Sequence, residues 1–309
     1  MNKFEYILTE NDKDIPIKKI MRREFGFSSR LMTKIKQNKS AYLNGESLPG
    51  WVTGDAGDVL TVMLPEETSD FEPEPIPISP VYEDNDLLII NKQPGFVVHP
   101  TKGHPAHTIA NGLMQYLIDT EQKFKIRFIN RLDMDTSGLL IIAKNSHAQD
   151  SFMKQMKANT IRKKYIAVVK GIIPENEGTI DLPIGRPDPD RVERWVMTEG
   201  GYPSVTHYSV IERFKNHTLV RLILETGRTH QIRVHMAYTG HPVLGDHLYG
   251  GENPLLIERQ ALHSQYLSFN HPVSDKRIDV EAPLHDDMLK LIEKLGLDYD
   301  ELKEKEVFK

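Results

Sequence analysis

The segment with the most evident chemical potential is Asn130–Gly138, where two carboxylates, an arginine, two hydroxyls and a glycine follow one another closely. Apolar runs stand on both sides, so the segment connects two strands, and such loops commonly carry catalytic groups. We expect Arg131 to keep the carboxylate of Asp133 ionised, which would suit a nucleophile or a base. On spacing alone, a turn capped by Asp133 or Asp135 and closed by Thr136–Gly138 is an equally good interpretation.

The same two carboxylates also allow phosphoryl transfer. Asp133-x-Asp135 followed by Thr136 resembles the nucleophile motif of haloacid-dehalogenase phosphatases, which use magnesium. That motif usually opens its domain and leads into a loop or helix, whereas here it lies far inside the chain and a strand follows. The downstream acidic pair Asp286–Asp287 stands in a predicted terminal helix without suitable neighbours. A magnesium-dependent phosphatase is therefore the less favoured alternative.

The elements that must position this segment fall into two units. The stretch 65–80 contains five prolines and five acidic residues without a base, which predicts an extended linker with few contacts. We expect a small domain at residues 1–64, a second domain at 81–285 and an acidic helical tail at 286–309. The chain of 309 residues has length enough for two domains.

The net charge of −5 conceals two basic regions. Residues 13–43 hold nine Lys and Arg against two acids, and residues 151–170 hold six against none. Local basic surfaces of this kind can bind polyanions, although each could also be an ordinary solvated face. The chain has no cysteine, which excludes disulfides and thiol nucleophiles. With no apolar run of about 18 residues and no apolar core near the start, we expect a cytoplasmic protein without membrane contact.

Apolar spacing predicts two basic helices in the first unit, over residues 17–25 and 29–37, followed by short strands with glycine turns. This order, together with Ser29-Arg30 at the start of the second helix and the Leu43–Gly45 turn, resembles the RNA-binding domain first seen in a small-subunit ribosomal protein, the S-four type. The resemblance implies that the helices lie on structured RNA, and the residues we expect to contact it are Lys18, Arg22, Arg30 and Lys34. A basic packing domain is the alternative.

The second unit mixes strand and helix patterns. Strands are predicted at 87–92, 126–130, 138–145, 163–171, 218–226 and 277–283, and helices at 108–119, 147–159 and 286–296. The strands outnumber the helices and do not alternate with them. The pattern therefore predicts an α+β domain with a mixed, largely antiparallel sheet, in place of a doubly wound parallel sheet.

Four segments of this unit, in order, resemble the pseudouridine synthases of the large-ribosomal-subunit type. They are Leu87–Pro100, Asn130–Asn145, Lys163–Gly171 and Glu225–Gly250, and together they span most of the second unit. Four motifs in order are far more specific than one. The resemblance implies a pseudouridine synthase fold, and an S-four-type domain ahead of it is a common arrangement in that family.

The resemblance also assigns roles residue by residue. The catalytic aspartate falls on Asp133, the buried aromatic that packs against the uracil on Tyr165, and the arginine that pairs with the carboxylate on Arg233. Arg131 corresponds to the arginine that fills the space left by the flipped nucleotide. Asn130 departs from the pattern, since many members have histidine there, and this leaves base flipping open to change.

These roles predict an RNA pseudouridine synthase that acts on structured ribosomal or transfer RNA. We expect no cofactor, no metal and a monomer, with Lys163 and Lys164 as phosphate contacts beside Tyr165. The carboxylate of Asp133 could add to carbon 6 of the uracil or attack the anomeric carbon of the ribose, and the sequence leaves both routes open. A non-catalytic RNA-binding protein on the same fold is the alternative from another functional class.

Overall fold

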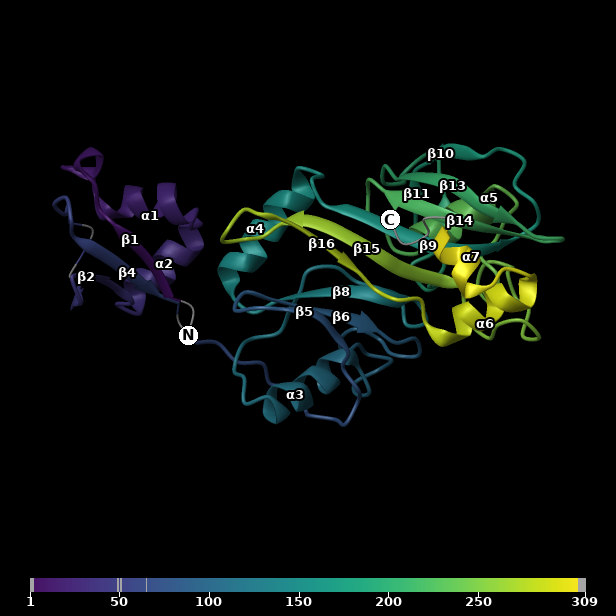
Figure 1. Ribbon diagram of the computed structural model, residues 1–309, viewed down its shortest axis with the longest axis horizontal. Coiled ribbons are helices and arrows are strands. Elements are labelled where there is room, and N and C mark those ends of the chain that lie inside the picture. The colour runs from purple at the N-terminus through teal and green to yellow at the C-terminus, as the bar shows by residue number, and fades with distance from the viewer. Residues whose placement is uncertain (1–2, 49, 51, 65, 305–309) are drawn as a thin grey trace.

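The computed structural model describes residues 3–48, 50, 52–64 and 66–304. Figure 1 shows two units joined by one extended segment. In the first unit, α1 (Ile17–Phe25) ends at Gly26, whose φ of 65° places it in the left-handed region. Helix α2 (Ser29–Gln37) begins where the Ser28 hydroxyl accepts a hydrogen bond from the main chain of Leu31. Both predicted helices are confirmed.

An antiparallel sheet completes the first unit, in the strand order β1-β4-β2-β3. Its elements are β1 (Lys3–Ile7), the 3-10 turn η1 (Glu10–Asp12), β2 (Ala41–Leu43), β3 (Glu46–Ser47) and β4 (Val59–Met63). Helices and sheet enclose a core of their own, which includes Phe4, Ile20, Leu31 and Leu60. The unit therefore has the separate core that an independent domain needs.

The prediction that the Pro/Glu stretch makes few contacts is wrong. Pro65 lies outside the described residues, and from Glu66 to Ser79 the chain runs without helix or strand along the second unit. Phe71 and Ile78 pack against the apolar core there, and the main-chain carbonyl of Glu72 accepts a hydrogen bond from Asn111. Glu67 forms ion pairs with Lys34 of α2 and with Arg127 of the second unit. Isolated apolar side chains between the prolines therefore anchor an extended segment.

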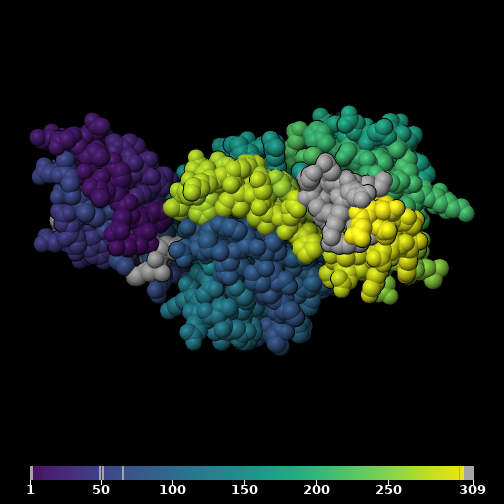
Figure 2. All heavy atoms as spheres, in the orientation of Figure 1, coloured from purple at the N-terminus to yellow at the C-terminus, as the bar shows by residue number. Residues whose placement is uncertain are grey.

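Further contacts join the two units beside helix α4 (Ser146–Lys157). His147 of α4 meets the rings of Phe4 and Phe27 edge to face, with ring centroids 5.3 Å apart in both cases. The ammonium group of Lys154 donates to the main-chain carbonyl of Gly26 at 3.2 Å. The first unit thus lies against the α4 end of the second, as Figures 1 and 2 show.

The second unit is built on a ten-stranded mixed sheet, and the predicted α+β class is confirmed. The strand order is β10-β13-β14-β9-β15-β8-β6-β5, with β16 added to β15 and β7 to β8. Among the described strands only the β8–β15 pair is parallel. The strands are β5 (Pro80–Glu83), β6 (Leu87–Lys92), β7 (Arg127–Phe128), β8 (Ser137–Ala143), β9 (Arg162–Lys170), β10 (Glu177–Asp181), β13 (Val205–Arg213), β14 (His217–Leu224), β15 (Leu262–Asn270) and β16 (Arg277–Glu281); a separate hairpin pairs β11 (Ile184–Gly185) with β12 (Trp195–Val196).

Helices cover both faces of this sheet. Because side chains alternate along a strand, Leu140 and Ile142 of β8 pack with α3 (Ile109–Asp119), while Leu139 and Ile141 pack with α4. The half of the sheet formed by β9 and β14 packs with α5 (Gln231–Tyr238) and α6 (Asp286–Leu295). The central strand β8 is buried on both sides, which explains its unbroken apolar run.

The expected acidic tail is an integral part of the second unit up to residue 304. Met288 and Leu291 of α6 are fully buried in the same core as Tyr165, and Leu302 of α7 (Tyr299–Glu304) joins them. The acidic groups of α6 lie on its outer face and in its first turn. Those in the first turn interact favourably with the positive end of the helix dipole. Residues 305–309, the end of the expected tail, lie outside the described residues.

Candidate active site

The Asn130–Thr136 segment is a tight loop between β7 and β8. The side-chain amide of Asn130 donates to the carbonyl of Leu139 at 3.1 Å and accepts from the main chain of Ile141 at 2.8 Å, which ties the start of the loop to β8. Its end is fixed by Gly138, where φ is 110° and a Cβ atom would lie 2.2 Å from the carbonyl oxygen of Ser264. The loop geometry therefore depends on bonds from the Asn130 side chain to the main chain of β8 at its start and on a glycine at its end.

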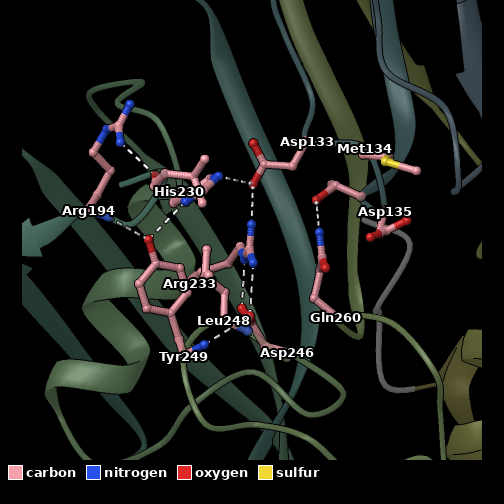
Figure 3. Close-up of polar contacts among 12 residues, drawn as sticks. Asp133, Met134, Asp135, Arg194, His230, Arg233, Asp246, Leu248, Tyr249 and Gln260 are labelled. Carbon is pink, nitrogen blue, oxygen red and sulfur yellow. Dashed lines mark hydrogen bonds and ion pairs between the residues drawn. The ribbon is translucent and has the colours of Figure 1, made fainter. Parts of the chain in front are cut away.

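Asp133 is the carboxylate that this loop presents to a pocket (Figure 3). Its Oδ2 accepts a hydrogen bond from Nη1 of Arg233 at 3.0 Å, across 100 residues of sequence. The other nitrogens of Arg233 form a two-bond pair with Asp246, at 2.7 and 2.9 Å. Asp246 is fully buried, whereas 18% of the Asp133 side chain remains exposed. One guanidinium thus joins a buried anchor to an accessible carboxylate, and such charge-assisted bonds are strong and directional.

The carboxylates around Arg233 offset the effect of its burial. Burial alone would lower the pKa of Arg233, but its bonds to Asp246 and the charges of Asp246 and Asp133 outweigh this and raise its pKa. Arg233 is therefore always cationic. Local spacing made Arg131 the expected charge partner of Asp133, and the structure corrects this, because Arg131 is exposed at the pocket mouth. The contact is made by Arg233, the arginine that the family resemblance implied.

Helix α5 carries Arg233 into the site, and its first residue holds the helix in place. The side-chain carbonyl of Gln231 accepts from the Thr226 hydroxyl and from the main chain of Arg228, at 2.8 and 3.0 Å. Its amide group donates to the carbonyl of Val205 at 2.9 Å. These bonds tie the first residue of α5 to strand β13. The position of Arg233 is therefore fixed by contacts other than its own.

Tyr165 completes the pocket wall from the centre of β9. Only 7% of the residue is exposed, and burial raises the pKa of its hydroxyl to about 12, so it is neutral. The pocket beside it opens to solvent and is lined also by Arg131, Asp133, Arg228 and Arg233. An aromatic side chain and a carboxylate in one basic pocket suit a planar ring with negatively charged attachments.

The remaining expected contacts lie in three places. Lys163 lines a neighbouring pocket that shares Arg228 with the Asp133 pocket, and burial lowers the pKa of its amine. Lys164 lies 4.3 Å from the ring centroid of Tyr266. Alternation along β9 directs its side chain away from the Asp133 pocket, so the expected pair of phosphate contacts is divided between two faces.

The cations of the first unit lie on α1 and α2. Lys18, Arg22 and Arg30 are exposed, and Lys34 is half-buried beside Glu67. Figure 1 places these helices at the end of the molecule opposite α5, which carries Arg233. The structure therefore does not bring these cations into the Asp133 pocket, and any RNA that contacts both must span the second unit.

Several supporting residues were missed by the reasoning from sequence. Asp246 anchors Arg233, and His230 and Tyr249 stand beside Asp133. Lys92 is fully buried, and its amine donates to the carbonyls of Gln93 and Met134 at 2.8 Å each. Polar residues inside the otherwise apolar or glycine-rich motif segments were the available signal, since a buried polar group needs a partner.

The two carboxylates of the loop have different surroundings, which disfavours the phosphatase alternative. Asp133 lines the pocket and Asp135 does not (Figure 3). Asp287, part of the downstream acidic pair, is held by Arg259 at 2.6 and 2.7 Å. A magnesium site would require carboxylates that converge on one point.

One group of described residues has the spacing of metal ligands, namely Asp84, Asp86 and His271. Asp84 already accepts hydrogen bonds from His271, from the Tyr82 hydroxyl and from the main chain of Asp86 and Leu87. These bonds account for the cluster as a stabilised turn ahead of β6. None of the described helices is long and apolar enough to span a membrane.

Comparison with known proteins identifies the family. The profile of a family described as RNA pseudouridylate synthase matches residues 86–238, which include Asp133, Tyr165 and Arg233. The chain is 41% identical to the uncharacterized RNA pseudouridine synthase YlyB of Bacillus subtilis (strain 168), covering 96% of this chain and 99% of that protein. It is 40% identical to ribosomal large subunit pseudouridine synthase D of Escherichia coli (strain K12), covering 77% of both chains.

A solved structure agrees with these relatives. Human RNA pseudouridylate synthase domain containing 1 superposes with a TM-score of 0.56 and 30% identity, covering 71% of this chain and 86% of that one. The family match includes the loop, strand β9 and helix α5 that together build the Asp133 pocket. The chain therefore belongs to the RNA pseudouridylate synthase family and is an RNA pseudouridine synthase.

Proposed function

We propose that the protein isomerises specific uridines in ribosomal RNA of the large subunit, with Asp133 as the nucleophile. The observation that carries the proposal is the Asp133 carboxylate, held at 3.0 Å by Arg233 and facing a pocket lined by Tyr165. Relatives named ribosomal large subunit pseudouridine synthase D support the choice of RNA.

The reaction requires the target base to leave its stack, because its carbon 5 and glycosidic bond are inaccessible in folded RNA. We assign Arg131, exposed at the pocket mouth, to the space that the flipped nucleotide vacates. The uracil then packs against Tyr165 with its ring near the carboxylate of Asp133. Arg233 orients that carboxylate, and a carboxylate nucleophile needs no separate base to activate it.

The bond changes balance within the substrate. The bond between nitrogen 1 and the anomeric carbon breaks, the uracil turns, carbon 5 bonds to the anomeric carbon, and the hydrogen of carbon 5 leaves as a proton while nitrogen 1 gains one. Asp133 can serve by adding to carbon 6 or by attacking the anomeric carbon, and each route returns the carboxylate unchanged. The isomerisation involves no net oxidation, so its balance needs no co-reactant.

We further propose that residues 1–64 form an S-four-type RNA-binding domain, whose contacts include Lys18, Arg22, Arg30 and Lys34. The exposed cations of α1 and α2 support this, since phosphate contacts dominate the affinity of proteins for RNA. Lys163 would add a contact beside the pocket and Lys164 one on the opposite face of β9. A ribosomal substrate implies work in the cytoplasm, and because one chain supplies every group of the pocket, we propose a monomer.

Loss of the carbon 5 hydrogen provides the test. Large-subunit ribosomal RNA and transfer RNA, each labelled with tritium at carbon 5 of uridine, are incubated with the protein, and released tritium is counted. We expect release from the ribosomal RNA, at a small number of sites that chemical mapping of pseudouridine then identifies. Release from transfer RNA alone would replace the proposed substrate, and release from neither would contradict the proposal.

A further inference from the structure

His230 adopts a backbone conformation that is uncommon for a residue with a side chain. Its φ of 58° and ψ of 17° lie in the left-handed region, directly before the first residue of α5. Such conformations carry strain and persist where surrounding contacts enforce them, often at functional sites. Here the conformation directs the imidazole ring toward the Asp133 pocket, as Figure 3 shows.

Two hydrogen bonds orient that ring. Nδ1 of His230 lies 2.9 Å from the hydroxyl of Tyr249, and this hydroxyl also accepts from the main-chain N–H of Arg194 at 2.8 Å. With Arg194 occupying one of its lone pairs, the hydroxyl is free to donate its single proton to Nδ1. The hydrogen of a neutral imidazole is then on Nε2, the nitrogen that faces Asp133.

Nε2 lies 3.8 Å from Oδ2 of Asp133, the same oxygen that Arg233 holds. This is longer than a hydrogen bond, and catalytic contacts of this kind commonly shorten only when substrate is bound. Asp133, Arg233, Arg194, Asp246 and Tyr249 are the charged and titratable groups around the ring. Burial, the largest influence, lowers the pKa of His230, so the ring is neutral at neutral pH.

We propose that His230 is a positioning residue for the nucleophile, whose Nε2–H, directed by the Tyr249 hydroxyl, holds Oδ2 of Asp133 and leaves Oδ1 free for the uridine. Arg233 supplies a positive charge at that oxygen, and His230 supplies a second hydrogen-bond donor from a different direction. The inference rests on the proposed role of Asp133. Protonation of the ring would add a positive charge beside the carboxylate and weaken it as a nucleophile, so turnover should fall as the pH drops through the pKa of His230.

The test compares His230→Gly, Tyr249→Phe and the control Tyr238→Phe, an exposed tyrosine at the end of α5. Glycine adopts the left-handed conformation without strain, so the first variant should fold. Single-turnover rates on tritium-labelled ribosomal RNA are measured from acid to alkaline pH, together with the dissociation constant for that RNA. We expect His230→Gly to slow the reaction about 10- to 100-fold and Tyr249→Phe by somewhat less, with the RNA affinity unchanged.

The pH profile separates positioning from a merely structural role. We expect the acidic fall in rate to move to lower pH in His230→Gly, while Tyr238→Phe keeps the wild-type rate and profile. Wild-type rates in His230→Gly, an unmoved acidic limb, or a loss explained by weaker RNA binding would each overturn the inference. Asp133→Asn is assayed in parallel, because turnover by that variant would refute the proposed function itself, whereas its inactivity beside an unaffected His230→Gly would refute only the role of His230.

Discussion

Two buried arginines contact the Asn130–Thr136 loop and form similar ion pairs. Arg233 forms a two-bond pair with Asp246, and Arg259 forms one with Asp287. In each case the remaining nitrogen, Nη1, reaches the loop: that of Arg233 bonds the side chain of Asp133, while that of Arg259 bonds the main-chain carbonyl of Asp135 at 2.8 Å.

The difference lies in what each arginine leaves accessible. Arg233 presents a carboxylate to a pocket, whereas Arg259 adds bonds to the carbonyls of Gln260 and Leu262 and to the Ser137 hydroxyl, and holds no carboxylate of that pocket. The same ionic construction therefore orients an accessible carboxylate in one case and buried groups around the loop in the other, which is the division that the proposed nucleophile requires. A bond to an accessible carboxylate, and not the presence of an ion pair, separates the two arginines.

The sharpest test of this contrast is the pair of loop carboxylates. Asp133→Asn removes the charge at the pocket, and we expect turnover to fall by at least about 10⁴-fold, to background, with RNA affinity largely kept. Asp135→Asn is the matched control and should be far milder, because only the main chain of Asp135 is held by Arg259. Equal losses in both variants, measured by tritium release, would contradict the assignment and favour chemistry that uses both carboxylates.

Removal of the Arg233 side chain should harm both activity and stability. Arg233→Ala leaves the fully buried Asp246 without its partner, at a cost of about 3–5 kcal/mol in the free energy of unfolding. Arg233→Lys keeps the charge but loses the planar fork, so turnover should also fall strongly. Double-mutant cycles of Arg233→Ala with Asp246→Asn and with Asp133→Asn, followed by denaturant unfolding, should show the larger coupling for Asp246. A larger coupling with Asp133 would make the partly exposed pair the structural one.

Substitution of Arg259 should reduce stability more than turnover. We expect Arg259→Lys to cost about 2 kcal/mol of stability, while the folded enzyme keeps turnover within about tenfold of the wild type. His285 and Arg259 outweigh burial and lower the pKa of Asp287, so its ionised form stabilises the fold above the ordinary pKa of an aspartate. Stability from this source is lost as the pH falls below about 4, and Asp287→Asn should flatten that part of the unfolding profile. An unchanged profile would show that Asp287 is not the anchor.

Lys92 also holds the Asn130–Thr136 loop, because its amine donates to the carbonyl of Met134. Burial lowers its pKa to about 7, and a neutral amine has two N–H donors for its two carbonyl partners. Between pH 7 and about 10 the unfolded chain binds a proton that the folded chain does not, so stability should rise with pH, by up to about 1 kcal/mol per unit. Lys92→Met should remove this rise in denaturant midpoints across that range. A rise that persists in the variant would assign it to another group.

The smallest effect on chemistry is expected from deletion of residues 1–64. The first unit has its own core, so the second should fold alone, although its surface at His147 loses the rings of Phe4 and Phe27. RNA binding should weaken and depend less steeply on salt, because phosphate contacts are lost. An unchanged salt dependence of the dissociation constant would mean that α1 and α2 do not touch RNA.

Local patterns in the sequence were sufficient for much of the fold. Helices α1 and α2 were predicted with their observed ends, since capping residues and apolar spacing act within a few residues. The central strand β15 and helix α5 were missed. Both are rich in buried polar residues, such as His263 and Gln265 in β15 and Gln231 and His235 in α5, which conceal the apolar period.

Residue types and their order were readable along the chain: a carboxylate in a strand-to-strand loop, an aromatic residue on a strand and an arginine far downstream. The folded chain was needed to show that Asp246 anchors Arg233, that Arg131 stays at the pocket mouth and that the Pro/Glu stretch packs on the second unit. The cause is the range over which these contacts act. Periodicity reports which face of an element is buried, but not which of many distant polar groups will meet there, and that choice depends on how the whole sheet places its strands.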